Sequence, residues 1–172
     1  MSTLSPTHSR SATARPEGSV DPRGQQFAAA VTSVVLAVVL LAAPSPVAVA
    51  LLAVQALLFA IGAGLGVQHT PHALVFKSVV RPRIGAPKEL EDAAPPRFAQ
   101  TVGLVFSIVG LAGFLTGLTA VGLVATGLAL VAALLNAVFG FCLGCELYLL
   151  AKRVSGGRAA KASPGGRAAK AL

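Results

Sequence analysis

Cys142 and Cys145 are the only cysteines of the chain, and two residues separate them in the sequence Cys-Leu-Gly-Cys. This spacing is shared by thiol redox sites and by half-sites for metal ions. On a helix the two side chains share a face with Glu146, and their α-carbons would lie about 5–6 Å apart, the separation that bridged cysteines prefer. The spacing therefore predicts a reversible catalytic dithiol with Glu146 as a modulator. The alternative is a pair of small side chains that only pack within a helix bundle.

The reactivity of these thiols depends on where their helix begins. If one helix runs through residues 121–151, the cysteines lie toward its C-terminus, where the macrodipole disfavours a thiolate and Glu146 adds a like charge. A break at Gly140 would instead begin a separate interfacial helix near Phe141, with Cys142 at its start. The sequence leaves both arrangements open.

His69 and His72 form a second pair with two intervening residues. Together with Cys142 and Cys145 they supply the four ligands of a Cys2His2 zinc site, provided that the chain brings them together. Otherwise no cofactor is expected, and the histidines cap a helix and bond lipid headgroups at the membrane interface.

The elements that position these residues are apolar helices. The chain has 172 residues, of which 55% are hydrophobic and 12% are charged, and its mean hydropathy is +0.77. Residues 24–76 and 98–145 contain no Asp, Glu, Lys or Arg. Each run is long enough for two spans of about 20 apolar residues with a turn between them. This composition excludes a water-soluble globule and predicts an all-α, polytopic membrane protein with a bundle of four transmembrane helices.

Proline, glycine and charge set the expected boundaries. A Ser-, Pro- and Arg-rich N-terminal segment predicts disorder, and so does the repeat GGRAAKA near the C-terminus. The prolines around Ser45 indicate a turn, and those of the central loop indicate extended chain. We expect disordered tails at 1–25 and 152–172, helices at about 26–43, 47–67, 101–118 and 121–151, and a loop at 68–99.

The basic residues explain the net charge of +8 without nucleic-acid binding. They lie in the two tails and in the central loop, so two helical hairpins would place all of them on one side of the membrane. By the positive-inside rule both termini are then cytoplasmic. The basic tails are expected to attract anionic lipids, and no aromatic-basic module for nucleic acid accompanies them.

The central loop carries charges of both signs on a proline-stiffened segment. Such a loop can dock a cytosolic partner through complementary charge, although charged loops are also often merely solvated. The expected docking residues are Arg81, Arg83, Glu89, Glu91, Asp92 and Arg97.

Polar and small residues within the spans indicate contacts between helices. Gln55 and Asn136 are expected to form interhelical hydrogen bonds. The Gly-xxx-Gly spacings at Gly62, Gly113 and Gly140 allow close approach of helix backbones and are expected to pack the bundle internally.

Four motifs resemble a family of small actinobacterial membrane proteins of unknown function: VDPRG at 20–24, VRPR at 80–83, EDAAPPRFAQ at 91–100 and FCLGCELY at 141–148. The resemblance covers residues 20–150. It implies a bacterial cytoplasmic membrane. It also implies a sulfur or thiol-redox context, because members of this family are often encoded beside a thioredoxin-like protein and a thiosulfate sulfurtransferase.

The leading hypothesis is a membrane-embedded dithiol protein that exchanges electrons or sulfane sulfur with a thioredoxin-like or rhodanese-like cytosolic partner. In this scheme Cys145, nearer to water, reacts first, and Cys142 resolves the mixed disulfide. The alternatives are a non-catalytic membrane scaffold or accessory subunit, and a small oligomeric transporter for a sulfur-containing solute. The sequence gives neither the oligomeric state nor whether the protein is an enzyme.

Overall fold

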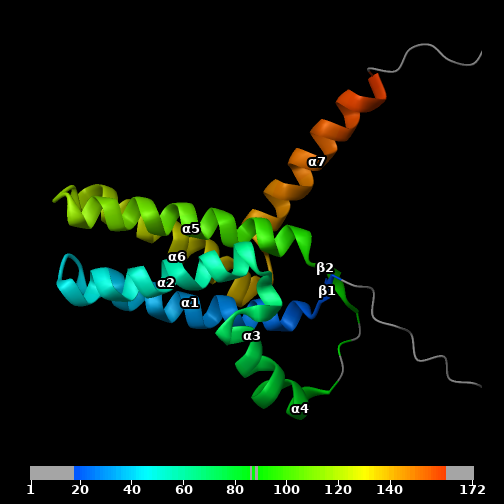
Figure 1. The fold of residues 1–172 in the computed structure, drawn as a ribbon, viewed down its shortest axis with the longest axis horizontal. Helices are drawn as coiled ribbons and strands as arrows, with labels where there is room; N and C mark the ends of the chain where they lie inside the picture. The colour runs from blue at the N-terminus through cyan, green and yellow to red at the C-terminus, as the bar shows by residue number, and fades with distance from the viewer. Residues whose placement is uncertain (1–17, 86, 88, 162–172) are drawn as a thin grey trace, which may run out of the picture.

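The computed structural model describes residues 18–85, 87 and 89–161, with side chains up to residue 155. Four long helices form a bundle in which neighbours run antiparallel: α1 (Pro22–Ala42), α2 (Pro46–Gly64), α5 (Ala94–Leu115) and α6 (Thr119–Phe139) (Figure 1). Each is long and apolar enough to cross a membrane. The prediction of an all-α bundle with four spanning helices is therefore confirmed.

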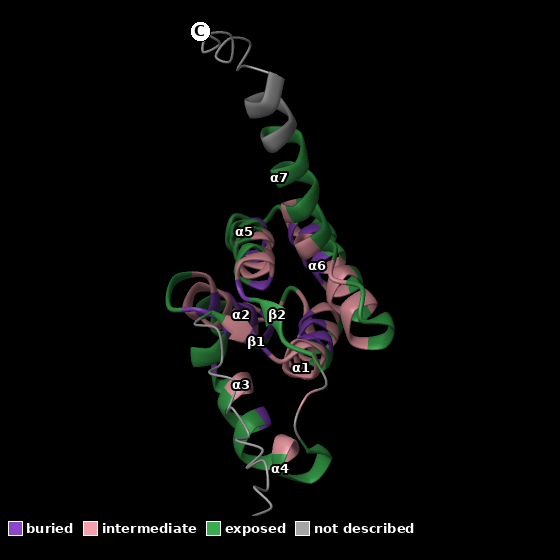
Figure 2. Cartoon of the chain, turned by 90° about the vertical axis from the view of Figure 1, so that its right-hand side faces the viewer, coloured by how far each residue is buried: buried purple, intermediate pink, exposed green. Residues whose placement is uncertain are grey.

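The four helices form a ring when viewed along the bundle (Figure 2). α1 packs against α2 and α6, and α5 packs against α2 and α6. As a result, α1 and α5 lie on a diagonal of the ring. The buried core contains Leu36, Val39, Ala48, Leu52, Phe114 and Ala129.

Most of the outward-facing surface of the bundle is apolar. Leu41 is 88% exposed, Leu115 is 70% exposed and Val138 is 66% exposed. A water-soluble protein rarely leaves so much contiguous apolar surface uncovered. On spanning helices, such side chains contact lipid tails.

The two ends of the bundle differ in construction. At one end, which we call the turn end, α1 joins α2 through residues 43–45 and α5 joins α6 through residues 116–118. Gly113 of α5 and Gly122 of α6 pack backbone to backbone there, and a Cβ at Gly113 would lie 2.9 Å from the Gly122 α-carbon. Gly113 thus packs the bundle internally, as expected, whereas Gly117 lies in the turn with a φ of 80° and no atom within 4 Å of an added Cβ.

The opposite end carries the described basic side chains, and we call it the basic end. The segment between α2 and α5 lies there, with η1 (Val67–His69), α3 (Pro71–Val75), η2 (Phe76–Val80) and α4 (Arg81–Ile84). Residues 71–84 project from the bundle as an arm, named the α3–α4 arm. Two short strands, β1 (Ser19–Val20) and β2 (Glu91–Asp92), pair antiparallel across this end (Figure 2).

Three of the long helices begin with proline in the first turn, where no backbone N–H is required. Asp21 caps α1 by accepting the Arg23 amide, and Ser45 caps α2 by accepting the Ala48 amide. The Asp92 carboxylate accepts the Ala94 amide at 2.9 Å, and α5 begins there. The expected starts near 26 and 101 are therefore too late, because these prolines begin helices rather than keep the chain extended.

The expected single helix at 121–151 is wrong. α6 ends at Phe139, and α7 (Leu143–Lys161) begins after a break and leaves the bundle at a steep angle (Figure 1). Residues 152–161, expected to be disordered, continue α7. The remaining parts of the two expected tails, 1–17 and 162–172, lie outside the described residues.

Candidate functional site

Gly140 produces the break between α6 and α7. Its φ of 68° is left-handed, a conformation that glycine adopts without the strain of a Cβ. Its amide donates to the Asn136 carbonyl at 3.0 Å, and the Phe141 amide donates to the Leu135 carbonyl at 3.3 Å. This glycine-terminated C-cap ends α6 and redirects the chain.

The two cysteines lie at the N-terminus of α7. The Cys142 carbonyl accepts the Glu146 amide at 3.0 Å, which opens the helix. The Cys142 Sγ accepts the Cys145 amide at 3.3 Å. A helix N-terminus stabilises negative charge, and hydrogen bonds to sulfur favour a thiolate. The dipole argument against active thiols, which assumed a helix C-terminus, therefore does not apply to this structure, although the Glu146 carboxylate still lies in the same first turn.

Cys142 and Cys145 form a disulfide in the structure, with a Cα–Cα distance of 5.2 Å. This separation lies within the range that bridged cysteines prefer. Both residues are half-buried. The local fold thus holds the two sulfurs within bonding distance at the start of a helix.

The first turns of α7 pack against the start of α5. A Cβ at Gly144 would lie 2.7 Å from the Ala99 α-carbon, so this contact requires glycine. One turn later the rings of Phe98 and Tyr148 lie 5.8 Å apart, and the Lys152 ammonium lies 5.9 Å from the Tyr148 ring centroid. These contacts fix the orientation of the helix that carries the cysteines.

Arg97 connects the same segment of α5 to α2. Its guanidinium donates to the carbonyls of Ala63 at 3.1 Å and Gly64 at 2.9 Å, which are the last residues of α2. Three residues further along α5, Gln100 packs against Gly62, where an added Cβ would lie 2.9 Å from its side chain. The first turns of α5 therefore join the end of α2 to the start of α7.

A second set of contacts fixes the α3–α4 arm. Arg23 forms an ion pair with Asp21 at 3.0 Å and donates to the Gly85 carbonyl, just after α4, at 3.1 Å. The ring of Phe76 packs against Phe27 with centroids 5.9 Å apart. The start of α1 thus contacts the middle of the arm and the residue that follows α4.

The family described as Domain of unknown function (DUF4395) matches residues 20–153. The chain belongs to this family. No curated protein and no solved structure matches it.

The four sequence motifs described above all lie at the basic end. VDPRG begins α1, VRPR ends the arm, EDAAPPRFAQ forms β2 and the start of α5, and FCLGCELY forms the break and the start of α7. Of these, EDAAPPRFAQ and FCLGCELY are in direct contact beside the dithiol, because Phe98 packs against Tyr148 and Ala99 against Gly144. The sequence pattern placed the cysteines, but it did not predict the contacts of Phe98 and Ala99 with Tyr148 and Gly144. The sequence signal for these contacts was that the four residues belong to the motifs EDAAPPRFAQ and FCLGCELY.

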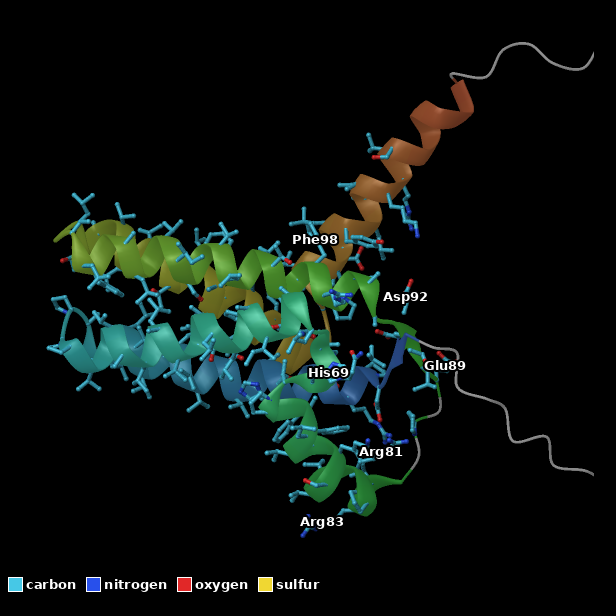
Figure 3. All side chains as sticks on the ribbon, viewed as in Figure 1. His69, Arg81, Arg83, Glu89, Asp92 and Phe98 are labelled. Carbon is cyan, nitrogen blue, oxygen red and sulfur yellow. A yellow bond between two sulfur atoms is a disulfide. The ribbon has the colours of Figure 1, made fainter. Side chains whose placement is uncertain are left out.

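The structure does not gather the expected docking residues of this DUF4395 protein into one patch. Arg97 and Asp92 cap helices, and Arg83 donates to the Val79 carbonyl within the arm. Figure 3 shows Arg83 at the far end of the arm, while Glu89 and Asp92 lie on the segment that returns to α5. Arg81 is half-buried, and Glu89 and Glu91 are exposed.

The histidines are separate from the cysteines. His69 is exposed on η1 and His72 is half-buried on α3, where burial lowers the pKa of its imidazole. Within the described part of the chain, no three His, Cys, Asp or Glu side chains come together in a way that could hold a metal ion. The four expected zinc ligands, His69, His72, Cys142 and Cys145, are therefore not assembled into one site.

Of the two polar residues expected to bond between helices, Gln55 makes such a bond, whereas Asn136 takes part in the cap that ends its own helix. The Gln55 amide of α2 donates to the Thr32 hydroxyl of α1 at 3.4 Å, and Gln55 is 1% exposed. Asn136 contributes its backbone carbonyl to the cap at Gly140. Both residues serve the architecture of the bundle.

Proposed function

We propose that this DUF4395 protein is a thiol–disulfide exchange protein of the bacterial cytoplasmic membrane. The observation that carries the proposal is the place of Cys142 and Cys145 at the N-terminus of α7, where the Cys142 Sγ accepts a backbone amide at 3.3 Å. This arrangement stabilises a thiolate without a nearby cation.

The hydrogen bond supports Cys142 as the nucleophile of the reduced pair, the reverse of the order expected from the sequence. The Cys142 thiolate attacks a disulfide of the partner, a bond forms between the two sulfurs, and one partner thiolate leaves. The Cys145 thiolate then attacks the Cys142 sulfur and releases the second partner thiolate. The partner gains two electrons, and Cys142–Cys145 becomes a disulfide.

A persulfide partner fits the same geometry. The Cys142 thiolate attacks the outer sulfur of the persulfide, takes up that sulfur and releases the partner's cysteine thiolate. Attack by Cys145 on the Cys142 sulfur then releases hydrosulfide and forms the disulfide. Both schemes use a cytosolic protein of the thioredoxin-like or rhodanese-like class.

A cytosolic location of the dithiol is supported by charge. The described basic side chains lie at the basic end together with the cysteines: Arg23, Lys77, Arg81, Arg83, Arg97, Lys152 and Arg153. Positively charged ends of multispanning proteins are retained on the cytoplasmic side. The proposal therefore has both termini in the cytoplasm.

The test compares the two single-cysteine variants in reduced, purified full-length protein. Cys145→Ser retains Cys142 and is expected to react severalfold faster with dithiodipyridine at neutral pH than Cys142→Ser, because only Cys142 receives the amide hydrogen bond. In membranes, Cys145→Ser is expected to accumulate a mixed disulfide with a cytosolic protein.

The double variant Cys142→Ser/Cys145→Ser is the control for adducts that do not depend on this pair. Equal, slow reaction of both single variants, with no adduct in either, would contradict the proposed function. Faster reaction of Cys142→Ser would contradict the order of attack and retain Cys145 as the nucleophile.

A further inference from the structure

A layer of polar side chains crosses the middle of the bundle. Each spanning helix contributes a buried residue to it: Thr32 from α1, Gln55 from α2, Ser107 from α5 and Thr126 from α6, which are between 1% and 6% exposed. All four lie within one turn of the middle of their helices. We call these four residues the polar layer. It lies within the bilayer, far from the cysteines at the basic end.

Contacts between the helices bring three members of the polar layer close together. A Cβ at Gly110 of α5 would lie 3.0 Å from both the Leu52 side chain of α2 and the Thr126 hydroxyl oxygen of α6. Gln55 and Ser107 each lie three residues from this contact, toward the basic end, so they are at one level of the antiparallel pair α2 and α5. Side chains on a helix lean toward its N-terminus, so Gln55 extends toward the level of Thr126.

Two oxygens of the polar layer, Gln55 Oε1 and Thr126 Oγ1, have no hydrogen-bond partner among the described residues. The other polar groups are paired: Gln55 Nε2 donates to Thr32 at 3.4 Å, and the Ser107 hydroxyl donates to the Gly103 carbonyl of its own helix at 2.9 Å. Within a bilayer an unpaired polar group is costly, because no bulk water is available to bond it. Buried groups of this kind are normally satisfied by protein or by bound water.

We propose that the polar layer binds one water molecule, which bridges Gln55, Ser107 and Thr126. The water donates its hydrogens to Gln55 Oε1 and to the Ser107 hydroxyl oxygen, which can still accept after donating to Gly103. Its oxygen accepts the Thr126 hydroxyl. Buried waters typically make about three hydrogen bonds, as this one does. The water thereby connects α2, α5 and α6, and the bond from Gln55 to Thr32 extends the network to α1.

The chemistry of the layer selects water over a metal cation. Its four side chains supply amide and hydroxyl oxygens and no carboxylate, whereas Ca²⁺ takes about 6–8 oxygen ligands, usually with carboxylates among them. On the side of the turn end the layer is closed by Leu36, Val39 and Leu52, which are fully buried. The site is therefore enclosed at that side rather than open through the bundle. The inference does not depend on the chemistry of the thiols.

The first test detects the water directly. Isotope-labelled full-length protein is reconstituted in phosphatidylcholine bilayers, and solid-state NMR measures magnetisation transfer from water to the Thr126 side chain and to the Gln55 side-chain amide. A gadolinium chelate in the aqueous phase relaxes bulk water. We expect transfer to both side chains to persist with the chelate, and transfer to Gln55 to fall severalfold in Thr126→Val. Absence of transfer in the unmodified protein would overturn the proposal.

The second test measures thermal unfolding in detergent. Thr126→Val replaces the hydroxyl by a methyl group of nearly the same size, and we expect it to lower the Tm by several degrees because the bond to water is lost. Thr116→Val is the control, since the Thr116 hydroxyl is exposed and bonds its own helix, and it is expected to change the Tm little. A Tm of Thr126→Val at or above that of the unmodified protein would overturn the proposal, because removal of an unpartnered hydroxyl does not destabilise.

A double-mutant cycle separates a shared water from two independent sites. Gln55→Met removes the amide and approximately keeps the side-chain length. If one water serves both residues, the variant Gln55→Met/Thr126→Val is expected to lose less stability than the two single losses added together. Additive losses would contradict the bridge. Coupling without magnetisation transfer from water would also overturn the proposal, because the two side chains would then bond each other directly.

Discussion

The turn end and the basic end close the same four helices by different means. At the turn end the side-chain hydrogen bonds are local: the Ser45 hydroxyl accepts the Ala48 amide, and the Thr116 hydroxyl donates to the Ala112 carbonyl. At the basic end Arg23 and Arg97 reach carbonyls of distant segments. Short turns are enough to reverse the chain between two helices, so the long-range hydrogen bonds of the basic end serve an additional purpose. The basic end holds α7 and its cysteines in one orientation.

The contact between Gly144 and Ala99 gives the strongest way to disturb the basic end alone. Gly144→Ala would place a Cβ 2.7 Å from the Ala99 α-carbon, and overpacking of this kind typically costs about 1–3 kcal/mol. We expect α7 to detach from α5 and the reduced Cys142 to lose its fast reaction with dithiodipyridine. Thermal unfolding in detergent and the thiol reaction rate measure the two effects.

Two matched glycine variants sharpen this prediction. Gly127→Ala adds the same methyl group where nothing lies within 4 Å, so it is expected to leave both properties unchanged. Gly113→Ala disturbs the turn end and is expected to lower stability without changing the thiol rate. Loss of thiol reactivity in Gly113→Ala would show that the two ends are not independent.

Substitution of Arg97 tests the hydrogen bonds between α5 and the end of α2. Arg97→Gln removes the donors to the Ala63 and Gly64 carbonyls, and hydrogen bonds from charged groups contribute about 1.5–3 kcal/mol when well formed. Because Arg97 is exposed, we expect a loss of about 1 kcal/mol in thermal unfolding. Arg97→Lys keeps the charge and is expected to restore only part of the loss. Full rescue by lysine would mean that charge, rather than the guanidinium geometry, caps α2.

Substitution of Gly140 tests the break between α6 and α7. Gly140→Ala places a Cβ on a residue with φ of 68°, which costs about 1 kcal/mol for an L-residue in this conformation. Gly140→Asn is the matched control, because asparagine tolerates the left-handed region better. We expect the alanine variant to unfold at a lower temperature than the asparagine variant. Equal stabilities would indicate that the strain is relieved by a continuous helix.

The smallest expected effect concerns His72. Burial lowers the pKa of His72 in the folded protein, whereas the unfolded chain titrates near its ordinary value of about 6.5. The unfolded state then binds more protons, so stability falls as pH decreases through about 6.5 toward the folded pKa. His72→Gln is expected to remove this part of the pH dependence in thermal unfolding between neutral and mildly acidic pH. His69→Gln, at an exposed position, serves as the control, and an unchanged profile in His72→Gln would contradict the prediction.

The four spans could be predicted from the sequence because long uncharged runs have few alternatives to crossing a bilayer. The helix starts were less predictable, since Pro95 and Pro96 read as breakers although they occupy the first turn of α5. The break at Gly140 could not be decided locally, because a Gly-xxx-Gly pair suits both a continuous packed helix and a C-cap. The decisive contact, Gly144 on Ala99, joins segments far apart in the sequence. The cysteine pair was predicted, but its position at the N-terminus of α7 depends on the break at Gly140.

The β1–β2 sheet has a mechanical consequence. Its two strands cross the diagonal between α1 and α5, and the Ala93 amide donates to the Gly18 carbonyl at 2.8 Å. Tension applied to the chain before Gly18 would therefore load β2 and then the first turn of α5. The next turn carries Phe98 and Ala99, which hold α7. A force on the chain before Gly18 would thus load α1 directly and also reach α7 through β2 and the start of α5.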